Sequence, residues 1–208
     1  MANKIKCFAD EAQCAMLRDT VDRAIAEDTI KIWRDDEGSD IRIYNAERKV
    51  PEFSPLYDAM VAHYTSERGV APKHSFLMVN RLIPMEGNLG SGGGWHRDTW
   101  LRQYKIFVFL SDVGEANGPF EYIPGSNRWS AKLKDLIRYR RSLRVPAGHV
   151  RGESVLLTVS AGEGTYFDTT TLHRGSPIRE GARYAATLYA FDTSGEKLRR
   201  SKERFDVM

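Results

Sequence analysis

A histidine and an aspartate two residues apart are the residues of this chain best suited to bind a metal. His96 and Asp98 follow a glycine run at 92–94, in the order Gly-Gly-Gly-Trp-His-Arg-Asp. In an extended backbone, side chains two residues apart point to the same side, so both groups can reach one ion. His173 supplies a third candidate ligand. Two imidazoles and one carboxylate on one face of a metal, with other positions open, are typical of non-heme Fe(II) oxygen chemistry.

An arginine ten residues after His173 adds a candidate anion-binding group. Arg183 begins the last apolar segment of the chain, so a tight hairpin could return its guanidinium toward the metal. The planar guanidinium suits a carboxylate, which it can bind through two parallel hydrogen bonds. The other histidines, His63, His74 and His149, are interpreted as structural, with contact to a substrate as the alternative for His149.

The elements that would position these groups begin with two helices. Apolar residues recur at three- and four-residue spacing from Asp10 to about Glu27, which predicts an amphipathic helix. The sequence Phe53-Ser54-Pro55 predicts the start of a second helix, with Ser54 as its N-cap and Pro55 in its first turn. We expect both helices to pack on a sheet.

Short apolar segments separated by glycine and proline turns dominate the rest of the chain. Strands are predicted at 41–44, 75–83, 103–110, 120–123, 154–159, 164–167 and 183–191. A further helix is predicted from Ser130, with Leu133, Leu136 and Ile137 facing inward. Helices followed by many short strands predict a mainly β fold with helical support (α+β), in the form of a sheet-on-sheet barrel or jelly roll.

Length and composition fit one globular domain. The chain has 208 residues, of which 41% are hydrophobic and 28% charged. No apolar run approaches the roughly 20 residues of a membrane-spanning helix, and the first residues lack the apolar core of a signal peptide. Cys7 and Cys14 are the only cysteines, which argues against a disulfide framework or a thiolate zinc site. We therefore expect a cytoplasmic protein that occupies residues 1–208 as a single domain.

Basic residues are concentrated in two segments, 138–151 and 197–202. The net charge of +3 is too small to predict nucleic-acid binding, for which a steep salt dependence would be the sign. The second segment is interpreted as a solvated tail. The first lies between the two halves of the candidate metal site, so Arg141 and Arg144 are candidates for contact with an anionic substrate. A solvated basic surface is the alternative.

These residues together resemble the oxygenases that depend on Fe(II) and 2-oxoglutarate and have a double-stranded β-helix (cupin-like) fold. Their signature is His-x-Asp, a distal His, and an Arg about ten residues later. The chain resembles in particular the phytanoyl-CoA dioxygenase-like group, through the motifs Trp95-His96-Arg97-Asp98, Leu110-Ser111-Asp112-Val113, Asn117-Gly118-Pro119 and Pro124-Gly125-Ser126-Asn127. The resemblance covers about 76–191, the expected oxygenase core, with helical support from 1–75. That group usually has His where this chain has Asn127, so the role of that histidine does not carry over.

The resemblance implies that His96, Asp98 and His173 hold Fe(II), and that 2-oxoglutarate chelates this iron while Arg183 binds its distal carboxylate. With O2, such a site hydroxylates an unactivated C–H bond of a small molecule and releases succinate and CO2. The basic segment suggests that this molecule is an anion. Because Asp98 is present, halogenation is disfavoured.

Further residues are candidates for contacts at this site. Lys105, Asn80 and Ser176 could contact 2-oxoglutarate, although Lys105 could instead extend to solvent from a strand end. Trp100, near Asp98, could line the substrate pocket. The glycine-rich segment 87–94 is a candidate mobile lid.

Two alternatives remain open. A cupin-like metal enzyme that does not use 2-oxoglutarate could share the three ligands, but it would not need Arg183. A binding module without catalytic activity would be expected to have lost ligands, and all three are present.

Overall fold

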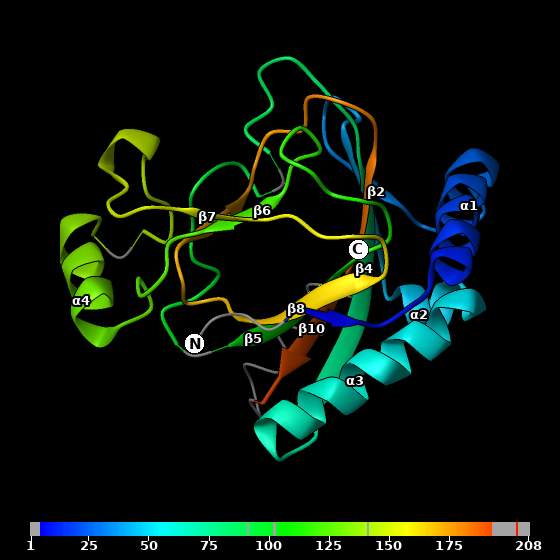
Figure 1. The fold of residues 1–208 in the computed structure, drawn as a ribbon, viewed down its shortest axis with the longest axis horizontal. Coiled ribbons are helices and arrows are strands. Elements are labelled where there is room, and N and C mark those ends of the chain that lie inside the picture. Colours follow the sequence, from blue (N-terminus) through cyan, green and yellow to red (C-terminus); the bar gives the residue numbers. More distant parts are fainter. Residues whose placement is uncertain (1–4, 91, 102, 141, 193–202, 204–208) are drawn as a thin grey trace.

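Two facing antiparallel sheets form the centre of the protein, and helices cover the outer side of the larger sheet (Figure 1). The computed structural model describes residues 5–90, 92–101, 103–140, 142–192 and 203. The larger sheet has seven strands in the order β1-β8-β5-β10-β4-β3-β2, and the smaller has three in the order β7-β6-β9. The predicted mainly β fold with helical support is confirmed.

The bounds of these elements follow the predicted segments, with β1, β2, β9 and the short helix α2 as additions. The larger sheet contains β1 Ile5–Cys7, β2 Trp33–Arg34, β3 Asp40–Tyr44, β4 His74–Leu82, β5 Tyr104–Phe109, β8 Glu163–Asp168 and β10 Arg183–Phe191. The smaller sheet contains β6 Phe120–Tyr122, β7 Val155–Leu157 and β9 His173–Gly175. The helices are α1 Glu11–Glu27, α2 Ala46–Lys49, α3 Ser54–Arg68 and α4 Trp129–Arg138, with 3-10 turns η1 Pro51–Phe53 and η2 Ala147–His149.

Helix α1 begins at a reciprocal capping box. The Asp10 carboxylate accepts a hydrogen bond from the backbone N–H of Gln13 at 2.8 Å, and the Gln13 side chain accepts one from the backbone N–H of Asp10 at 2.9 Å. Both bonds satisfy N–H groups that the first helical turn leaves without intrahelical partners. The predicted start of this helix is therefore correct.

Helix α3 begins differently from the prediction. Ser54 is the first helical residue, and its hydroxyl donates to the carbonyl of Glu47 at 3.1 Å instead of capping the helix. The predicted N-cap is wrong because the 3-10 turn η1 runs directly into α3, so that Phe53 takes the cap position. Phe53 is fully buried and anchors the turn in the core.

The main core lies between the larger sheet and the helices α1 and α3. Val79 of β4 and Leu188 of β10 form one buried cluster with Leu17 of α1 and Met60 of α3. The opposite side of the same sheet faces the smaller sheet, and a second buried cluster lies between them, composed of Phe109, Val113, Phe120, Leu157, Val159, Phe167 and Ala185.

The space between the sheets also receives polar side chains. Because side chains alternate along a strand, Arg183 and Tyr189 of β10 point to the same side as Ala185 of the second cluster. Tyr189 lies opposite Lys105 of β5 in the sheet register, and Arg183 lies opposite Leu82 of β4. The two sheets thus enclose several of the residues predicted to form the site.

Helix α4 lies at the edge of the molecule, apart from both sheets (Figure 1). The helix itself is predicted correctly, although it begins at Trp129. The predicted inward orientation is wrong for Leu133, which is 39% exposed, and for Ile137, which is 71% exposed, whereas Leu136 is half-buried. In the described part of the chain α4 lies apart from both sheets, so neither sheet covers this apolar face.

Candidate metal centre

A short antiparallel pairing of two distant segments places the histidines side by side. His96 and His173 exchange two backbone hydrogen bonds, each of 2.9 Å, and their ring centroids are 4.6 Å apart. Two residues further along, the backbone N–H of Asp98 donates to the carbonyl of Thr169 at 3.1 Å. The extended backbone at 96–98 therefore brings the His96 and Asp98 side chains to the same side, as their spacing predicts.

The three candidate ligands converge in the structure. The Nε2 atoms of His96 and His173 lie 3.5 Å and 3.8 Å from Oδ1 of Asp98. One ligand atom from each residue lies within 4.8 Å of the other two, and within the described residues this is the group of histidine and carboxylate side chains arranged to hold a metal ion. Two imidazoles and one carboxylate in this arrangement match the donor set of a non-heme Fe(II) site.

The backbone fixes the orientation of both imidazoles. Nδ1 of His96 lies 2.8 Å from the carbonyl of Gly94, and Nδ1 of His173 lies 2.8 Å from the carbonyl of Thr171. A carbonyl can only accept, so each Nδ1 carries the proton and each Nε2 keeps its lone pair. Hydrogen bonds of this kind orient metal-binding histidines.

The protonation states of the site also favour metal binding. Burial lowers the pKa of His173 to about 4, although Asp98 opposes this shift, so the imidazole is neutral at neutral pH. Burial would raise the pKa of Asp98, but the Lys105 ammonium holds it well below its ordinary value. The site thus offers a neutral His173 imidazole and an ionised Asp98 carboxylate, the forms that bind metals.

Lys105 is buried and pairs with the outer oxygen of Asp98. Its Nζ lies 2.8 Å from Asp98 Oδ2 and 3.8 Å from the centroid of the Tyr189 ring. Burial would lower the pKa of Lys105, but Asp98 outweighs this effect and raises it. The lysine does not extend to solvent, and it leaves Oδ1 of Asp98 facing the imidazoles.

Arg97, between the first two ligands, is a residue that the sequence reasoning missed. Its side chain is only 1% exposed, and its guanidinium donates to the Thr170 carbonyl and to the Asp135 carboxylate of α4. Its backbone N–H donates to the carbonyl of Leu143 at 2.9 Å. One signal was available: in an extended His-Arg-Asp segment the middle side chain points away from the metal and into the protein.

Arg183 is buried with an incomplete set of hydrogen bonds. Its guanidinium donates to the carbonyl of Gly118, and its Nε has no hydrogen-bond partner among the described residues. Burial lowers its pKa to about 10, which still leaves it charged at neutral pH. Gly118 lies two residues before Phe120, whose ring is 5.3 Å from the His173 ring. A buried guanidinium with free donor capacity suits a carboxylate ligand.

The other two cosubstrate candidates lie in different surroundings. Asn80 is buried in β4, and its amide donates to Oδ1 of Asp40 at 3.3 Å. Ser176 lies just beyond β9, and its hydroxyl donates to Glu121 at 2.9 Å. Three residues from His173 along an extended segment, it points to the opposite side of the strand. The structure therefore does not bring Ser176 to the metal ligands.

A cavity of about 650 Å3 opens beside the glycine-rich loop, and its described lining includes none of the three candidate ligands. Gly92 lines this cavity, and a Cβ on Gly92 would lie 2.5 Å from Cε1 of His96. The guanidinium of Arg144 also lines it and donates to the carbonyls of Gly92 and Gly93 at 2.9 Å and 2.7 Å. Absence of a side chain at Gly92 therefore lets the glycine-rich loop pass directly over the imidazole.

Trp100, a further substrate candidate, does not line this cavity. Trp100 is half-buried, lies under the Arg97 guanidinium, and accepts a hydrogen bond from Lys132 through its carbonyl at 3.4 Å. Arg141 lies outside the described residues. Movement of the glycine-rich loop as a lid stays a prediction, although Asn88 ties the loop to Ser39 through a 2.7 Å hydrogen bond.

Facing sheets that enclose a His-Asp-His group define a metal-dependent enzyme of the double-stranded β-helix class. Residues 3–184 match the phytanoyl-CoA dioxygenase (PhyH) family, so the chain belongs to this family. The predicted class, an oxygenase that depends on Fe(II) and 2-oxoglutarate, is thereby confirmed. No curated protein matches the chain in a sequence comparison. None of the helices in the described part of the chain is long and apolar enough to cross a membrane.

Solved structures share this fold at low sequence identity. HygX from Streptomyces hygroscopicus, with nickel and 2-oxoglutarate bound, is 16% identical with a TM-score of 0.68, and the match covers 93% of this chain and 84% of HygX. EvdO2 from Micromonospora carbonacea var. aurantiaca, complexed with 2-oxoglutarate, is 20% identical with a TM-score of 0.65 and coverages of 89% and 84%. The epimerase SnoN, in complex with Fe3+, alpha ketoglutarate and nogalamycin RO, is 17% identical with a TM-score of 0.63 and coverages of 90% and 77%.

Proposed function

We propose that this oxygenase hydroxylates an unactivated C–H bond of a small polar molecule and releases succinate and CO2. His96, Asp98 and His173 are the proposed Fe(II) ligands, and Arg183 is the proposed partner of the distal carboxylate of 2-oxoglutarate. The observation that carries this proposal is the convergence of two oriented imidazoles and one carboxylate, with ligand atoms within 4.8 Å of one another.

Each residue of the site has a defined task in this proposal. Bound Fe(II), with 2-oxoglutarate and O2, supplies the oxidising chemistry for the C–H bond. The carbonyls of Gly94 and Thr171 hold the two imidazoles with Nε2 toward the metal position. Lys105 holds Oδ2 of Asp98, which keeps that carboxylate ionised and leaves Oδ1 to bind the metal.

The assignment of Arg183 is supported by its incomplete hydrogen bonding. A carboxylate buried without a partner would be destabilised by several kcal/mol at least, so the distal end of 2-oxoglutarate needs a cation in the interior. Arg183 is buried and charged; its guanidinium donates to the Gly118 carbonyl, and its Nε has no hydrogen-bond partner among the described residues. Asn80 and Lys105 face the same interior and are further candidates for contact with the cosubstrate.

The cavity lining supports a polar substrate and gives no particular support to an anionic one. Its charged residues are the carboxylates of Asp35, Glu37, Asp40 and Glu86 and the guanidiniums of Arg42 and Arg144. Both guanidiniums already have partners, because Arg42 pairs with Asp40 at 2.5 Å and Arg144 binds the glycine carbonyls. The expectation of an anionic substrate therefore rests on the basic segment alone.

Epimerisation is the second candidate reaction, because SnoN, which shares the fold, is an epimerase that uses alpha ketoglutarate. Both reactions begin with removal of hydrogen from carbon, and they differ in whether an oxygen atom enters the product. Labelled O2 separates them. Label in the product would establish hydroxylation, and a product with an inverted carbon and no label would establish epimerisation.

The metal assignment is tested by anaerobic titration of the protein with Fe(II) and then 2-oxoglutarate. Chelation of Fe(II) by 2-oxoglutarate should produce a charge-transfer band in visible light, and added O2 should release succinate. His173→Ala should abolish both signals because it removes a ligand. His149→Ala is the matched control, since this histidine is exposed in η2 and should leave both signals unchanged. A full band in the His173→Ala protein would refute the assignment.

A further inference from the structure

An apolar stripe on the exposed side of α4 is not explained by the fold or by the proposed reaction. Trp129 is 73% exposed, Leu133 39% and Ile137 71%. Residues four apart lie on the same side of a helix, so the three form one stripe about 12 Å long. None of them lines the cavity beside the glycine-rich loop.

The opposite side of α4 holds the helix to the protein. Asp135 pairs there with the buried guanidinium of Arg97. At 3.6 residues per turn, Asp135 lies about 200° around the helix from Leu133, which directs the stripe away from the body. The Nζ atom of Lys132 adds a second attachment through its 3.4 Å hydrogen bond to the Trp100 carbonyl. The side of α4 that carries Asp135 therefore contacts the protein, and the apolar stripe faces away from it.

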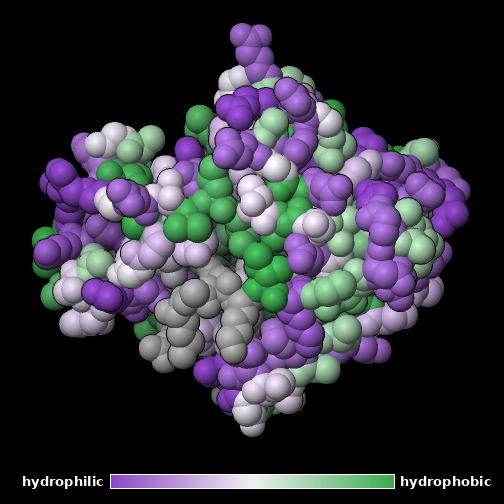
Figure 2. Space-filling view, viewed as in Figure 1, coloured by the Kyte–Doolittle hydropathy of each residue, from purple (hydrophilic) through white to green (hydrophobic). Residues whose placement is uncertain are grey.

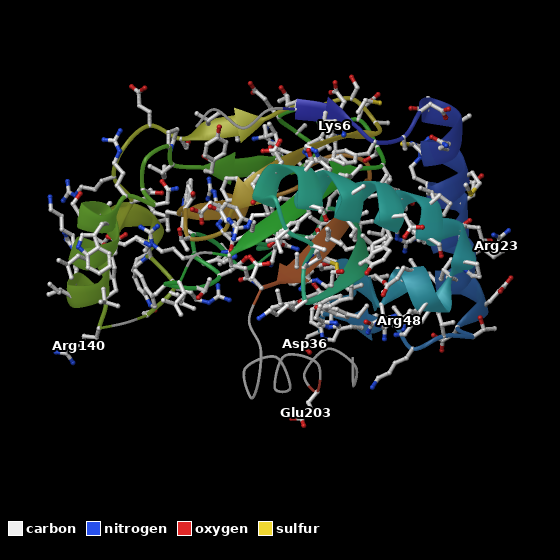
Figure 3. All side chains as sticks on the ribbon, turned by 90° about the horizontal axis from the view of Figure 1, so that it is seen from below. Lys6, Arg23, Asp36, Arg48, Arg140 and Glu203 are labelled. Carbon is white, nitrogen blue, oxygen red and sulfur yellow. The ribbon has the colours of Figure 1, made fainter. Side chains whose placement is uncertain are left out.

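The stripe lies in a strongly basic segment of the chain, and three exposed basic residues are on or beside α4. The segment 128–151 contains eight of the chain's 31 basic residues and one of its 28 acidic residues, so it carries +7 while the rest carries −4. Lys134, Arg138 and Arg140 are exposed on or beside α4, and Arg140 points away from the body of the molecule (Figure 3). In the space-filling view, the end of the molecule that carries α4 is largely hydrophilic, with hydrophobic residues among the hydrophilic ones (Figure 2).

A partner of this surface must offer negative charge and an apolar layer together. Nucleic acid offers phosphates but would leave Trp129 and Ile137 in water. Contact of α4 with α4 of a second copy would bring like charges together, which is unfavourable. A bilayer with anionic headgroups provides both properties, because basic residues bind headgroups while tryptophan and aliphatic side chains enter the acyl boundary.

We propose that α4 is a docking surface for an anionic phospholipid bilayer, on which the helix lies parallel to the membrane plane. With 10 residues the helix is too short to cross a bilayer. Trp129, Leu133 and Ile137 enter the interface, and Lys134, Arg138 and Arg140 contact the headgroups. This surface is separate from the metal ligands, so the proposal stands or falls independently of the proposed reaction.

The proposal is tested by co-sedimentation of the full chain with vesicles. Binding is expected to vesicles of equal parts phosphatidylcholine and phosphatidylglycerol, to be absent with phosphatidylcholine alone, and to weaken in high salt. Arg138→Ser should weaken binding about fivefold, the effect of one basic residue near an anionic surface. Trp129→Ser and Ile137→Ser should each weaken it about tenfold or more, because each removes a large apolar group from the interface.

Matched controls lie in the connection between α3 and β4, outside α4. Val70→Ser removes an apolar side chain that is 55% exposed, and Lys73→Ser removes an exposed charge, and neither should change binding. Trp129→Phe should keep most of the binding and lose the vesicle-induced shift of tryptophan fluorescence. This variant keeps the test decisive if a serine variant fails to fold.

Several results would overturn the proposal. These are no binding to anionic vesicles, equal loss of binding in the α4 and control variants, and a fluorescence shift that persists in Trp129→Phe. Binding of a DNA duplex instead of vesicles, lost in the same α4 variants, would assign the surface to nucleic acid. Self-association in sedimentation equilibrium that Ile137→Ser abolishes would assign it to a second copy.

Discussion

Removal of the Asp135 carboxylate should destabilise the protein more than removal of its partner Arg97. Arg97 is 1% exposed and Asp135 24% exposed, so the ion pair has one fully buried and one partly hydrated member. Asp135→Ala leaves a buried guanidinium with the Thr170 carbonyl as its remaining acceptor, and breaking a buried pair in this way costs about 3 kcal/mol or more. Arg97→Met leaves the Asp135 carboxylate within reach of water and the Thr170 carbonyl without its donor. We expect this to lower the free energy of unfolding by about 1–3 kcal/mol.

The double variant Arg97→Met/Asp135→Ala gives the sharper measurement. Because the buried charge is already gone in Arg97→Met, adding Asp135→Ala should cost little more, so the double variant should resemble Arg97→Met. Urea unfolding followed by tryptophan fluorescence gives the three free energies of unfolding. If the two single effects simply add in the double variant, the residues do not interact and the reasoning is refuted.

The same variants should also weaken metal binding, because Arg97 lies between His96 and Asp98. We expect about a 10- to 100-fold loss of affinity for Fe(II) or Mn(II), as for other residues that orient metal ligands. The control is Asp22→Ala, which breaks the 2.8 Å pair of Asp22 with Arg81 between α1 and β4. It should lower stability and leave metal affinity unchanged. If the control loses as much metal affinity as Asp135→Ala, the loss is caused by general destabilisation and not by the orientation of the ligands.

Three further predictions address the cosubstrate, the glycine loop and the cysteines. Arg183→Met should raise the 2-oxoglutarate concentration needed for succinate release by about 100-fold or more, while metal affinity is unchanged; an unchanged requirement would exclude this arginine as the carboxylate partner. Gly92→Ala should impair metal binding far more than Gly94→Ala, because both have positive φ but only the first would place a Cβ against an imidazole, at 2.5 Å. Cys7 is exposed, whereas burial raises the pKa of the Cys14 thiol to about 11, so iodoacetamide at mildly alkaline pH should alkylate one cysteine in the folded protein and two in urea. Alkylation of Cys14 in the folded protein would contradict its burial.

Local patterns in the sequence were sufficient for the parts of the fold and site that depend on neighbouring residues. The period of two in an extended backbone correctly places His96 beside Asp98, and the apolar spacing from Asp10 to about Glu27 correctly predicts α1. Ser54 shows the limit of such reasoning. Its type and position suit an N-cap, but the preceding 3-10 turn, set by the burial of Phe53, moves the cap by one residue.

Features that depend on distant partners could not be read from the sequence. The buried face of α4 is decided by the ion pair of Asp135 with Arg97, 38 residues away, and not by the apolar stripe that usually marks it. Ser176 points away from the candidate metal ligands because it lies an odd number of residues from His173, and its hydroxyl donates to the Glu121 carboxylate. Lys105 is paired with Asp98 through the closure of the sheet, a contact that no spacing in the sequence indicates.

The metal centre should also stabilise the fold, because its ligands belong to segments that the two sheets bring together. His173 is part of β9 in the smaller sheet, whereas Asp98 pairs with Lys105 of the larger sheet. A metal at 100 times its dissociation constant stabilises the folded state by about 2.7 kcal/mol, and for a chain of this size each kcal/mol raises Tm by about 2–4 °C. Saturation with Fe(II) or Mn(II) should therefore raise Tm by about 5–11 °C over the protein in chelator. In His173→Ala the metal-induced increase in Tm should be nearly lost. An increase in Tm of full size in that variant would mean that the stabilising metal binds elsewhere.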